Sequence, residues 1–173
     1  MRSKFAIADH PIHAILVAIP IGLYAWTLVA DIAYIGTGKD HMWYDIAFWA
    51  GIGAIVSALI AALPGLGDFF TVVAHTEARR TGLMHMSINL GVVALFTIAM
   101  LLMLDDGALD GGSLAAVVAL HAVAVGGLLL AGWLGGEMTF RHHIGMIPED
   151  AEAERDQQVR HGTTPGAIRP SHR

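Results

Sequence analysis

Histidine is the residue type that can support chemistry in this chain of 173 residues. The sequence holds ten histidines and no cysteine. Imidazole ligates iron, zinc and copper and exchanges protons near neutral pH, whereas the lack of cysteine excludes disulfides, thiolate metal sites, cysteine nucleophiles and thioether-linked c-type haem. No glycine-rich phosphate loop, HExxH or GxSxG motif occurs. The sequence therefore indicates neither a hydrolase nor a transferase, and ligand chemistry rests on the histidines.

The elements that position these histidines follow from a very apolar composition. Hydrophobic residues make up 55% of the chain and charged residues 14%, and the mean hydropathy is +0.58. A soluble domain carries roughly a quarter charged residues, so the composition predicts an integral membrane protein that contacts the lipid bilayer. The formal net charge is -5 and no long basic run occurs, which argues against a nucleic-acid partner.

Four apolar stretches are long enough to cross a bilayer, because each exceeds the ~20 residues that span the hydrocarbon layer as a helix. Polar, turn-rich links separate them, which predicts an all-α fold: a polytopic membrane protein with an up-down bundle of four transmembrane helices and no internal repeat. The predicted spans are about residues 12–35, 46–70, 83–104 and 114–135. The predicted organisation is an N-terminal segment, a transmembrane domain and a polar tail, over residues 1–11, 12–145 and 146–173.

Basic residues near the helix ends predict the orientation. An even number of crossings places both termini and the second loop on one side of the membrane. That side carries six basic residues near the helix ends, whereas the other side carries Lys39 alone. The positive-inside rule then predicts that both termini lie in the cytoplasm. The six residues are Arg2, Lys4, Arg79, Arg80, Arg141 and Arg155.

This topology gathers six histidines at the cytoplasmic side. Bis-histidine ligation between facing helices holds many b-type haems, and we predict His13 and His85 as the ligand pair. The pair suits haem b or a metal ion, with His10 and His142 as substitute haem ligands and His10 as a further metal ligand. The six histidines are His10, His13, His75, His85, His142 and His143.

Further residues extend the predicted site. Asn89 lies one turn after His85 on the same helix face, and Gly132 and Gly135 lie at the same depth, where they leave room for a porphyrin ring. Ionisable side chains nearby are expected to orient the ligands or to relay protons. These side chains are Asp31, Asp68, Glu137 and Arg141.

The same residues also have structural interpretations. The two histidines can instead form polar contacts between helices. Asp68 can pair with a nearby arginine, because a carboxylate near hydrocarbon needs a cation. Glu137 and Arg141 are four residues apart and can form an ion pair along one helix. His121 is a further functional candidate within the fourth span, although no second in-membrane histidine matches it.

Five segments stand out by their order and spacing. They are HPIHAILVAIPIGL (10–23), a span closing with Asp31, AALPGLGDFF (61–70), ARRTGLMHMSINL (78–90) and GWLGGEMTFRHHIGM (132–146). Over about residues 9–147 the chain thereby resembles the bacterial family of four-helix membrane proteins filed as domain of unknown function 2231. The resemblance implies an inner-membrane protein of uncharacterised activity. Related domains are fused to Rieske iron–sulfur or cytochrome modules, which implies electron transfer for some members.

The resemblance also implies which positions are typical of the family. Many members read HPxHP, whereas this chain has Ala14 after His13, and Ala18 stands where some members have another histidine. The typical positions present here are His10, Pro11, His13, Pro20, Asp31, Pro64, Asp68, His85, Asn89, Gly132, Gly135, Gly136, Glu137, Arg141 and His142.

These observations predict a small redox or electron-transfer subunit of the bacterial inner membrane that binds haem b or a metal ion. Its electron partner would be a quinone or a separate redox protein. A non-catalytic scaffold or accessory subunit is the alternative, and a third interpretation is a proton or metal-ion permease that uses Asp31, Asp68 and His121. Small-residue faces on the second and fourth spans also allow a homodimer.

Overall fold

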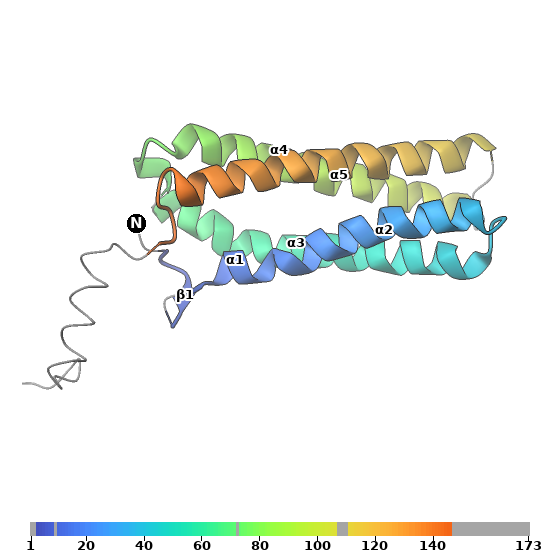
Figure 1. Cartoon of the computed structure of the whole chain (residues 1–173), viewed down its shortest axis with the longest axis horizontal. Coiled ribbons are helices and arrows are strands. Elements are labelled where there is room, and N and C mark those ends of the chain that lie inside the picture. The colour runs from blue at the N-terminus through green and yellow to red at the C-terminus, as the bar shows by residue number, and fades with distance from the viewer. Residues whose placement is uncertain (1–2, 9, 72, 107–110, 147–173) are drawn as a thin grey trace, which may run out of the picture.

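Four long helices lie side by side in the structure, a computed structural model that describes residues 3–8, 10–71, 73–106 and 111–146 (Figure 1). This arrangement confirms the predicted all-α bundle. The elements in chain order are β1 (Ala6–Ile7), β2 (His10–Pro11), α1 (Ile12–Leu16), α2 (Ala18–Gly36), α3 (His41–Thr71), the 3-10 helix η1 (Val73–His75), α4 (Arg79–Asp106) and α5 (Gly111–Phe140). The tail after residue 146 lies outside the described residues.

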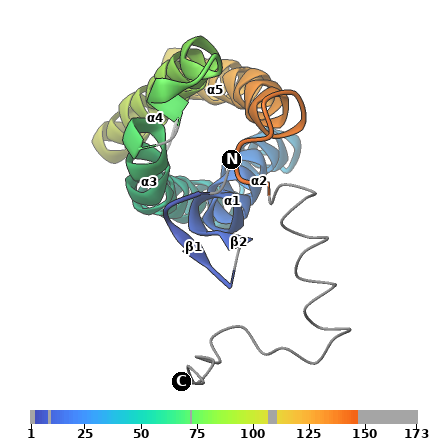
Figure 2. The ribbon, with the colours of Figure 1, turned by 90° about the vertical axis from the view of Figure 1, so that its left-hand side faces the viewer.

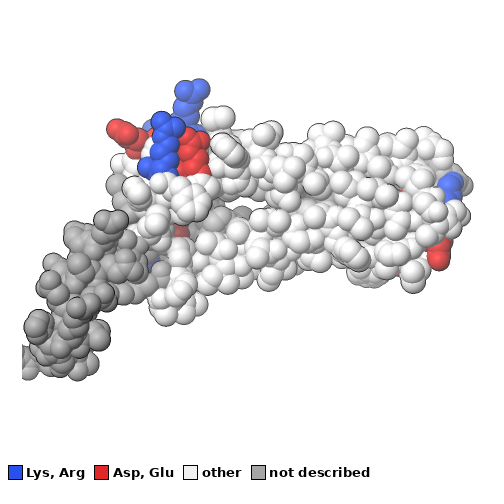
Figure 3. Space-filling view, viewed as in Figure 1, with Lys and Arg blue, Asp and Glu red and all other residues white. Residues whose placement is uncertain are grey.

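The bundle has the surface of an integral membrane protein. The α1–α2 segment and the helices α3, α4 and α5 are each long and apolar enough to cross a membrane. Figure 3 shows acidic and basic side chains at the two ends of the bundle and a broad uncharged belt between them. The helices run past the predicted spans because polar residues at their ends continue the helical turns beyond the apolar core.

A proline explains why the first span is divided. The chain leaves regular helix at Val17, between α1 and α2. Pro20 has no backbone N–H to donate to the carbonyl of Leu16, and its ring crowds that carbonyl. The helix resumes with Ile21 N donating to Val17 O at 3.2 Å, so the first span stays continuous enough to cross the bilayer while its first turn is set apart.

The helices form two hairpins, the first made of α1, α2 and α3 and the second of α4 and α5. α2 packs mainly along α3, and α4 packs mainly along α5, with fewer contacts between the hairpins through α2 with α5 and α3 with α4. Figure 2 shows the resulting ring of four helices from the end that carries the N-terminal segment. α2 therefore lies diagonally across the bundle from α4, and α3 from α5.

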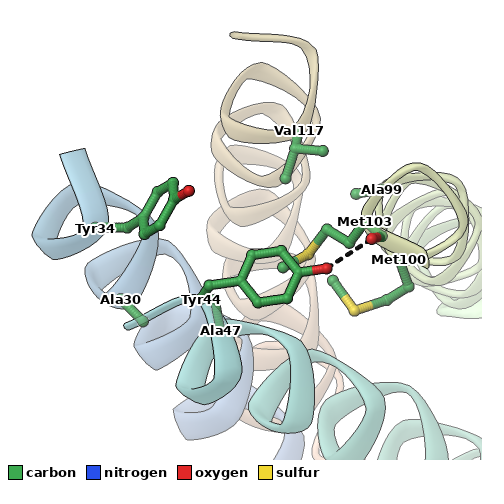
Figure 4. Packing of buried hydrophobic residues seen from close by; sticks show 8 residues of the cluster. All are labelled: Ala30, Tyr34, Tyr44, Ala47, Ala99, Met100, Met103 and Val117. Carbon is green, nitrogen blue, oxygen red and sulfur yellow. Dashed lines mark hydrogen bonds between the residues drawn. The ribbon is translucent and has the colours of Figure 1, made fainter. Parts of the chain in front are cut away.

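A buried cluster joins the hairpins near the end opposite the N-terminal segment (Figure 4). Tyr44 on α3 donates its hydroxyl to the carbonyl oxygen of Met103 on α4, at 2.6 Å. Gly51 lies so close to Met100 that an added Cβ atom would come 2.7 Å from the methionine sulfur. This close approach lets α3 and α4 pack without an intervening side chain on α3.

The N-terminal segment folds back onto the end of α3. β1 and β2 pair antiparallel, with Ala6 opposite Pro11. The carboxylate of Asp68 accepts hydrogen bonds from the backbone amides of Lys4 and Phe5, at 2.8 Å and 3.3 Å. The Phe5 ring lies over Gly67, where a Cβ atom would come within 2.3 Å of it. The segment is thus anchored to the bundle by both polar and apolar contacts.

Candidate histidine site in the bundle

His13 lies in α1 and is held by the neighbouring helix of its own hairpin. Its Nδ1 atom lies 2.7 Å from the carbonyl oxygen of Ala61 on α3. The ring rests against Gly65, where a Cβ atom would come 2.7 Å from Nδ1. A helical carbonyl already accepts from the amide four residues later, and the absence of a side chain at Gly65 opens the flank of the Ala61 carbonyl to the imidazole.

His85 is held in the same way by the second hairpin. Its Nδ1 atom lies 2.8 Å from the carbonyl oxygen of Ala131 on α5. The ring contacts Gly135, four residues after Ala131, where a Cβ atom would lie 3.4 Å from Cε1. The first helix of each hairpin therefore places a histidine on a carbonyl and a glycine of the second helix. The two hairpins therefore hold their histidines through the same two kinds of contact.

These contacts assign the hydrogen on each ring. A carbonyl oxygen only accepts, so the Nδ1 atoms of His13 and His85 carry the hydrogens, and in the neutral ring Nε2 keeps a lone pair. Asn89 agrees with this assignment, since its Nδ2 lies 3.3 Å from Nε2 of His85 while it also donates to the His85 carbonyl at 2.9 Å. Both rings thus retain the nitrogen that most often binds a metal.

The two rings meet across the bundle. Their centres lie 6.4 Å apart and their planes are nearly perpendicular, at 85°. α1 and α4 belong to different hairpins, so the meeting of His13 and His85 joins the two halves of the molecule. Within the described part of the chain, no group of three or more histidine, aspartate or glutamate side chains is placed to hold a metal ion.

The other predicted histidines lie apart from this pair. His10 is exposed in β2, and its Nδ1 lies 2.7 Å from the carbonyl oxygen of Ala8. His75 is exposed in η1, and His142 is half-buried in the turn after α5, where its backbone amide donates to Glu137 O at 3.4 Å. The structure therefore brings together two of the six histidines that the predicted topology placed at one depth.

The predicted glycines differ in their surroundings. Gly132 faces the outside of the bundle and has no atom within 4 Å of an added Cβ. The space beside Gly135 is taken by the His85 ring. The expectation that both glycines leave a gap for a porphyrin is not met, because one faces away from the site and the other seats the histidine itself.

Three of the predicted ionisable residues form contacts with each other or with the N-terminal segment. Glu137 accepts from the guanidinium of Arg141 at 2.8 Å, four residues later on the same helix, as the structural interpretation predicts. Asp68 binds the N-terminal segment in place of the expected arginine, and Ser3 Oγ also donates to it. Backbone amides supply the donors here because the N-terminal segment crosses the end of α3 at this point.

Asp31 and His121, which the permease interpretation named together with Asp68, form a direct pair that the sequence did not predict. The Oδ2 atom of Asp31 on α2 lies 2.6 Å from Nδ1 of His121 on α5, and the two side chains are 3% and 0% exposed. The only signal in the sequence is that both are ionisable and lie within spans. Their pairing depends on the contact between α2 and α5, which local sequence does not show.

The comparison with protein families decides the affiliation of the chain. The family described as "Predicted membrane protein (DUF2231)" matches residues 9–148. The chain belongs to this family. The match to the DUF2231 family covers all four long helices and includes His13, His85, Asp31 and His121. No curated protein and no solved structure matches the chain. The DUF2231 description gives a membrane protein and no activity.

Proposed function

We propose that this chain is a redox subunit of the bacterial inner membrane that binds one haem b between His13 and His85. The supporting observation is that two imidazole rings from different hairpins come together, each with Nδ1 bonded to a carbonyl and Nε2 as the remaining ligand atom. Bis-histidine ligation requires two such nitrogens and no third protein ligand, which agrees with the lack of a larger ligand cluster among the described residues.

The separation of the rings supports ligation of a single ion. A metal bound at about 2.0 Å from a nitrogen of each ring holds two ring centres on opposite sides of it roughly 6 Å apart, and the observed separation is 6.4 Å. Ligation at Nε2 of His85 would displace the Asn89 amide, which keeps its bond to the His85 carbonyl. The porphyrin itself needs the helices to move apart around the pair, because Gly135 is already in contact with His85.

The protein's own groups would set the properties of the ligands. The carbonyls of Ala61 and Ala131 accept the Nδ1 hydrogens and so fix the orientation of both rings and increase their basicity. We propose that both termini lie in the cytoplasm, which puts the pair in the cytoplasmic half of the membrane. A quinone or a separate redox protein would then exchange electrons with the haem from that side.

A visible spectrum tests this proposal. The full chain is produced in haem-replete cells and purified in mild detergent, and a reduced-minus-oxidised spectrum is recorded together with iron analysis. We expect the bands of a low-spin b-type haem, their loss in His13→Gln and in His85→Gln, and their retention in the matched control His75→Gln, which changes an exposed histidine at the same end. A colourless, iron-free wild-type protein would overturn the proposal.

A specific observation favours a non-catalytic scaffold as the second candidate. Each histidine ties the two helices of its hairpin through a side chain to carbonyl hydrogen bond, which is a contact that also stabilises helix pairs in membranes. For a scaffold, the wild-type protein carries no cofactor, and the double variant His13→Gln, His85→Gln melts at a lower temperature but still binds its membrane partners.

A further inference from the structure

A second polar cluster lies deeper in the bundle, toward the end opposite the N-terminal segment. Its centre is the buried contact between Asp31 and His121. On α5, His121 precedes Ala131 by ten residues, so it lies about 15 Å along the helix axis from the level of the His13–His85 pair. The two clusters share no residue.

No lysine or arginine that the structure describes compensates the pair. Among the described residues, the lysines and arginines are exposed and lie at the ends of the bundle (Figure 3), and the buried polar or charged side chains are Thr27, Asp31 and His121. An isolated carboxylate in hydrocarbon is very costly. Relative to neutral imidazole and carboxylate, the pair therefore carries one added proton, which makes it neutral overall. This proton lies either on the ring, which gives imidazolium with carboxylate, or on Asp31, which gives imidazole with carboxylic acid.

The neutrality of the pair determines whether Nε2 of His121 donates or accepts a hydrogen bond. The imidazolium carries hydrogens on both ring nitrogens. When the carboxylic acid donates to Nδ1, the remaining ring hydrogen is on Nε2. In both arrangements Nε2 is a hydrogen-bond donor, yet it is fully buried and has no partner within the described part of the chain. A buried donor without an acceptor is costly, so this atom points to a bound group.

A second buried atom without a partner lies at the same level. The hydroxyl of Tyr24 is buried and has no partner among the residues with described positions, and the whole side chain is 1% exposed. The rings of Tyr24 and His121 both contact Phe96 on α4, with ring centres 4.3 Å and 4.4 Å from it. A buried water forms hydrogen bonds to just such unsatisfied groups, and a water can accept from Nε2 while it bonds to the tyrosine hydroxyl.

We propose that Asp31, His121 and Tyr24 form a proton-exchange site inside the membrane, in which one water bridges Nε2 of His121 to the Tyr24 hydroxyl. The proton leaves when the N–H bond at Nε2 breaks with its electron pair kept on nitrogen, and the bridging water accepts the proton and becomes hydronium. From either neutral arrangement the product is a carboxylate with a neutral imidazole that carries its hydrogen on Nδ1, and the pair then has a net charge of minus one. Return of a proton to Nε2 restores neutrality.

The side chains that pack around Asp31 and His121 are uncharged, so the proton is exchanged at the pair itself. From α2, Thr27 donates its hydroxyl to the carbonyl oxygen of Leu23. From α4, the contact is the uncharged ring of Phe96. The other titratable side chains in the buried core of this half are Tyr34 on α2 and Tyr44 on α3, and the Tyr44 hydroxyl donates to Met103 O.

Nuclear magnetic resonance of histidine ring nitrogens tests the site. The full chain is labelled with ¹⁵N-histidine and placed in lipid nanodiscs, and the His121→Gln variant identifies the His121 signals. At neutral pH we expect a hydrogen on Nε2 of His121 and a cross-peak between that hydrogen and water. A ring without a hydrogen on Nε2, or an Nε2 hydrogen with no contact to water, would overturn the proposal.

Two variants separate this site from mere packing. Tyr24→Phe keeps the ring against Phe96 and removes the hydroxyl, so the water cross-peak falls several-fold while the contact between Asp31 and His121 persists. The matched control Tyr34→Phe removes the hydroxyl of another buried tyrosine, outside the cluster, and leaves the cross-peak unchanged. An equal cross-peak in wild type and Tyr24→Phe would contradict the bridging water.

Discussion

His13 and His85 occupy equivalent positions in the two helical hairpins. Each donates from Nδ1 to a carbonyl of the following helix, at 2.7 Å and 2.8 Å, and each rests on the glycine four residues after that carbonyl. The centres of the two rings lie 6.4 Å apart between the hairpins. A ligand shared by the rings would take one bond from each hairpin and so hold the halves together.

Alanine at the glycine under His13 is expected to displace that histidine. In Gly65→Ala the new Cβ would come 2.7 Å from Nδ1 of His13, so the ring must shift and loses its bond to the Ala61 carbonyl. Overpacking of this kind costs about 1–3 kcal/mol. Thermal unfolding in detergent, monitored by circular dichroism, measures this loss of stability. The haem content of the variant measures the effect at the histidine site.

Alanine substitutions at two other glycines are expected to affect stability less than Gly65→Ala. Gly135→Ala places a Cβ 3.4 Å from His85, which is close to ordinary contact, so its effect is expected to be smaller. Gly132→Ala meets no atom within 4 Å and favours helix, so its melting temperature should equal or exceed that of the wild type. If all three variants melt alike, the glycine contact does not position the histidines.

Removal of the Asp68 charge is expected to free the N-terminal segment. In Asp68→Asn the amides of Lys4 and Phe5 lose a charged acceptor, and hydrogen bonds to charged groups are worth about 1.5–3 kcal/mol. Hydrogen exchange over residues 3–8 should accelerate while exchange in the helices stays constant. Glu137→Gln, which breaks only the exposed pair with Arg141, is the control, and equal exchange in both variants would argue against the anchor.

The absence of native cysteine allows a clean test of orientation. Single cysteines are introduced as Lys39→Cys between α2 and α3 and as Arg80→Cys at the start of α4. With both termini in the cytoplasm, a membrane-impermeant thiol reagent added to intact spheroplasts labels the first variant and leaves the second unlabelled until lysis. The reverse pattern would place the His13–His85 pair in the outer half of the membrane.

The hydrogen bond between Tyr44 and Met103 should contribute measurably to the joining of the hairpins. Tyr44→Phe keeps the ring in the buried cluster and leaves the Met103 carbonyl without its hydroxyl donor. The expected loss is about 1 kcal/mol, seen as a lower melting temperature in detergent. Tyr34→Phe tests the neighbouring ring, and a greater loss there would show that Tyr44 is not the main polar link.

Much of the architecture could be predicted from local patterns. Long apolar runs predict spans because a helix must satisfy every backbone group inside lipid. Helical spacing predicts that Pro20, Tyr24, Thr27 and Asp31 share one face, and all four are buried. The contact of Glu137 with Arg141 follows from the same spacing. His13 and His85 could be named as a pair because both lie near the start of spans that run in the same direction.

The contact partners of individual side chains could not be predicted from local patterns. Asp31 meets His121 across 90 positions, Asp68 meets the N-terminal segment, and Gly135 seats His85 where a gap was expected. Each contact depends on how far one helix is rotated and shifted along its neighbour. Apolar surfaces pack in many such registers, and close contact between small residues selects among them. The spacing of residues along the chain predicts a helix and its faces. The register between two helices is decided only by their packing in the tertiary structure.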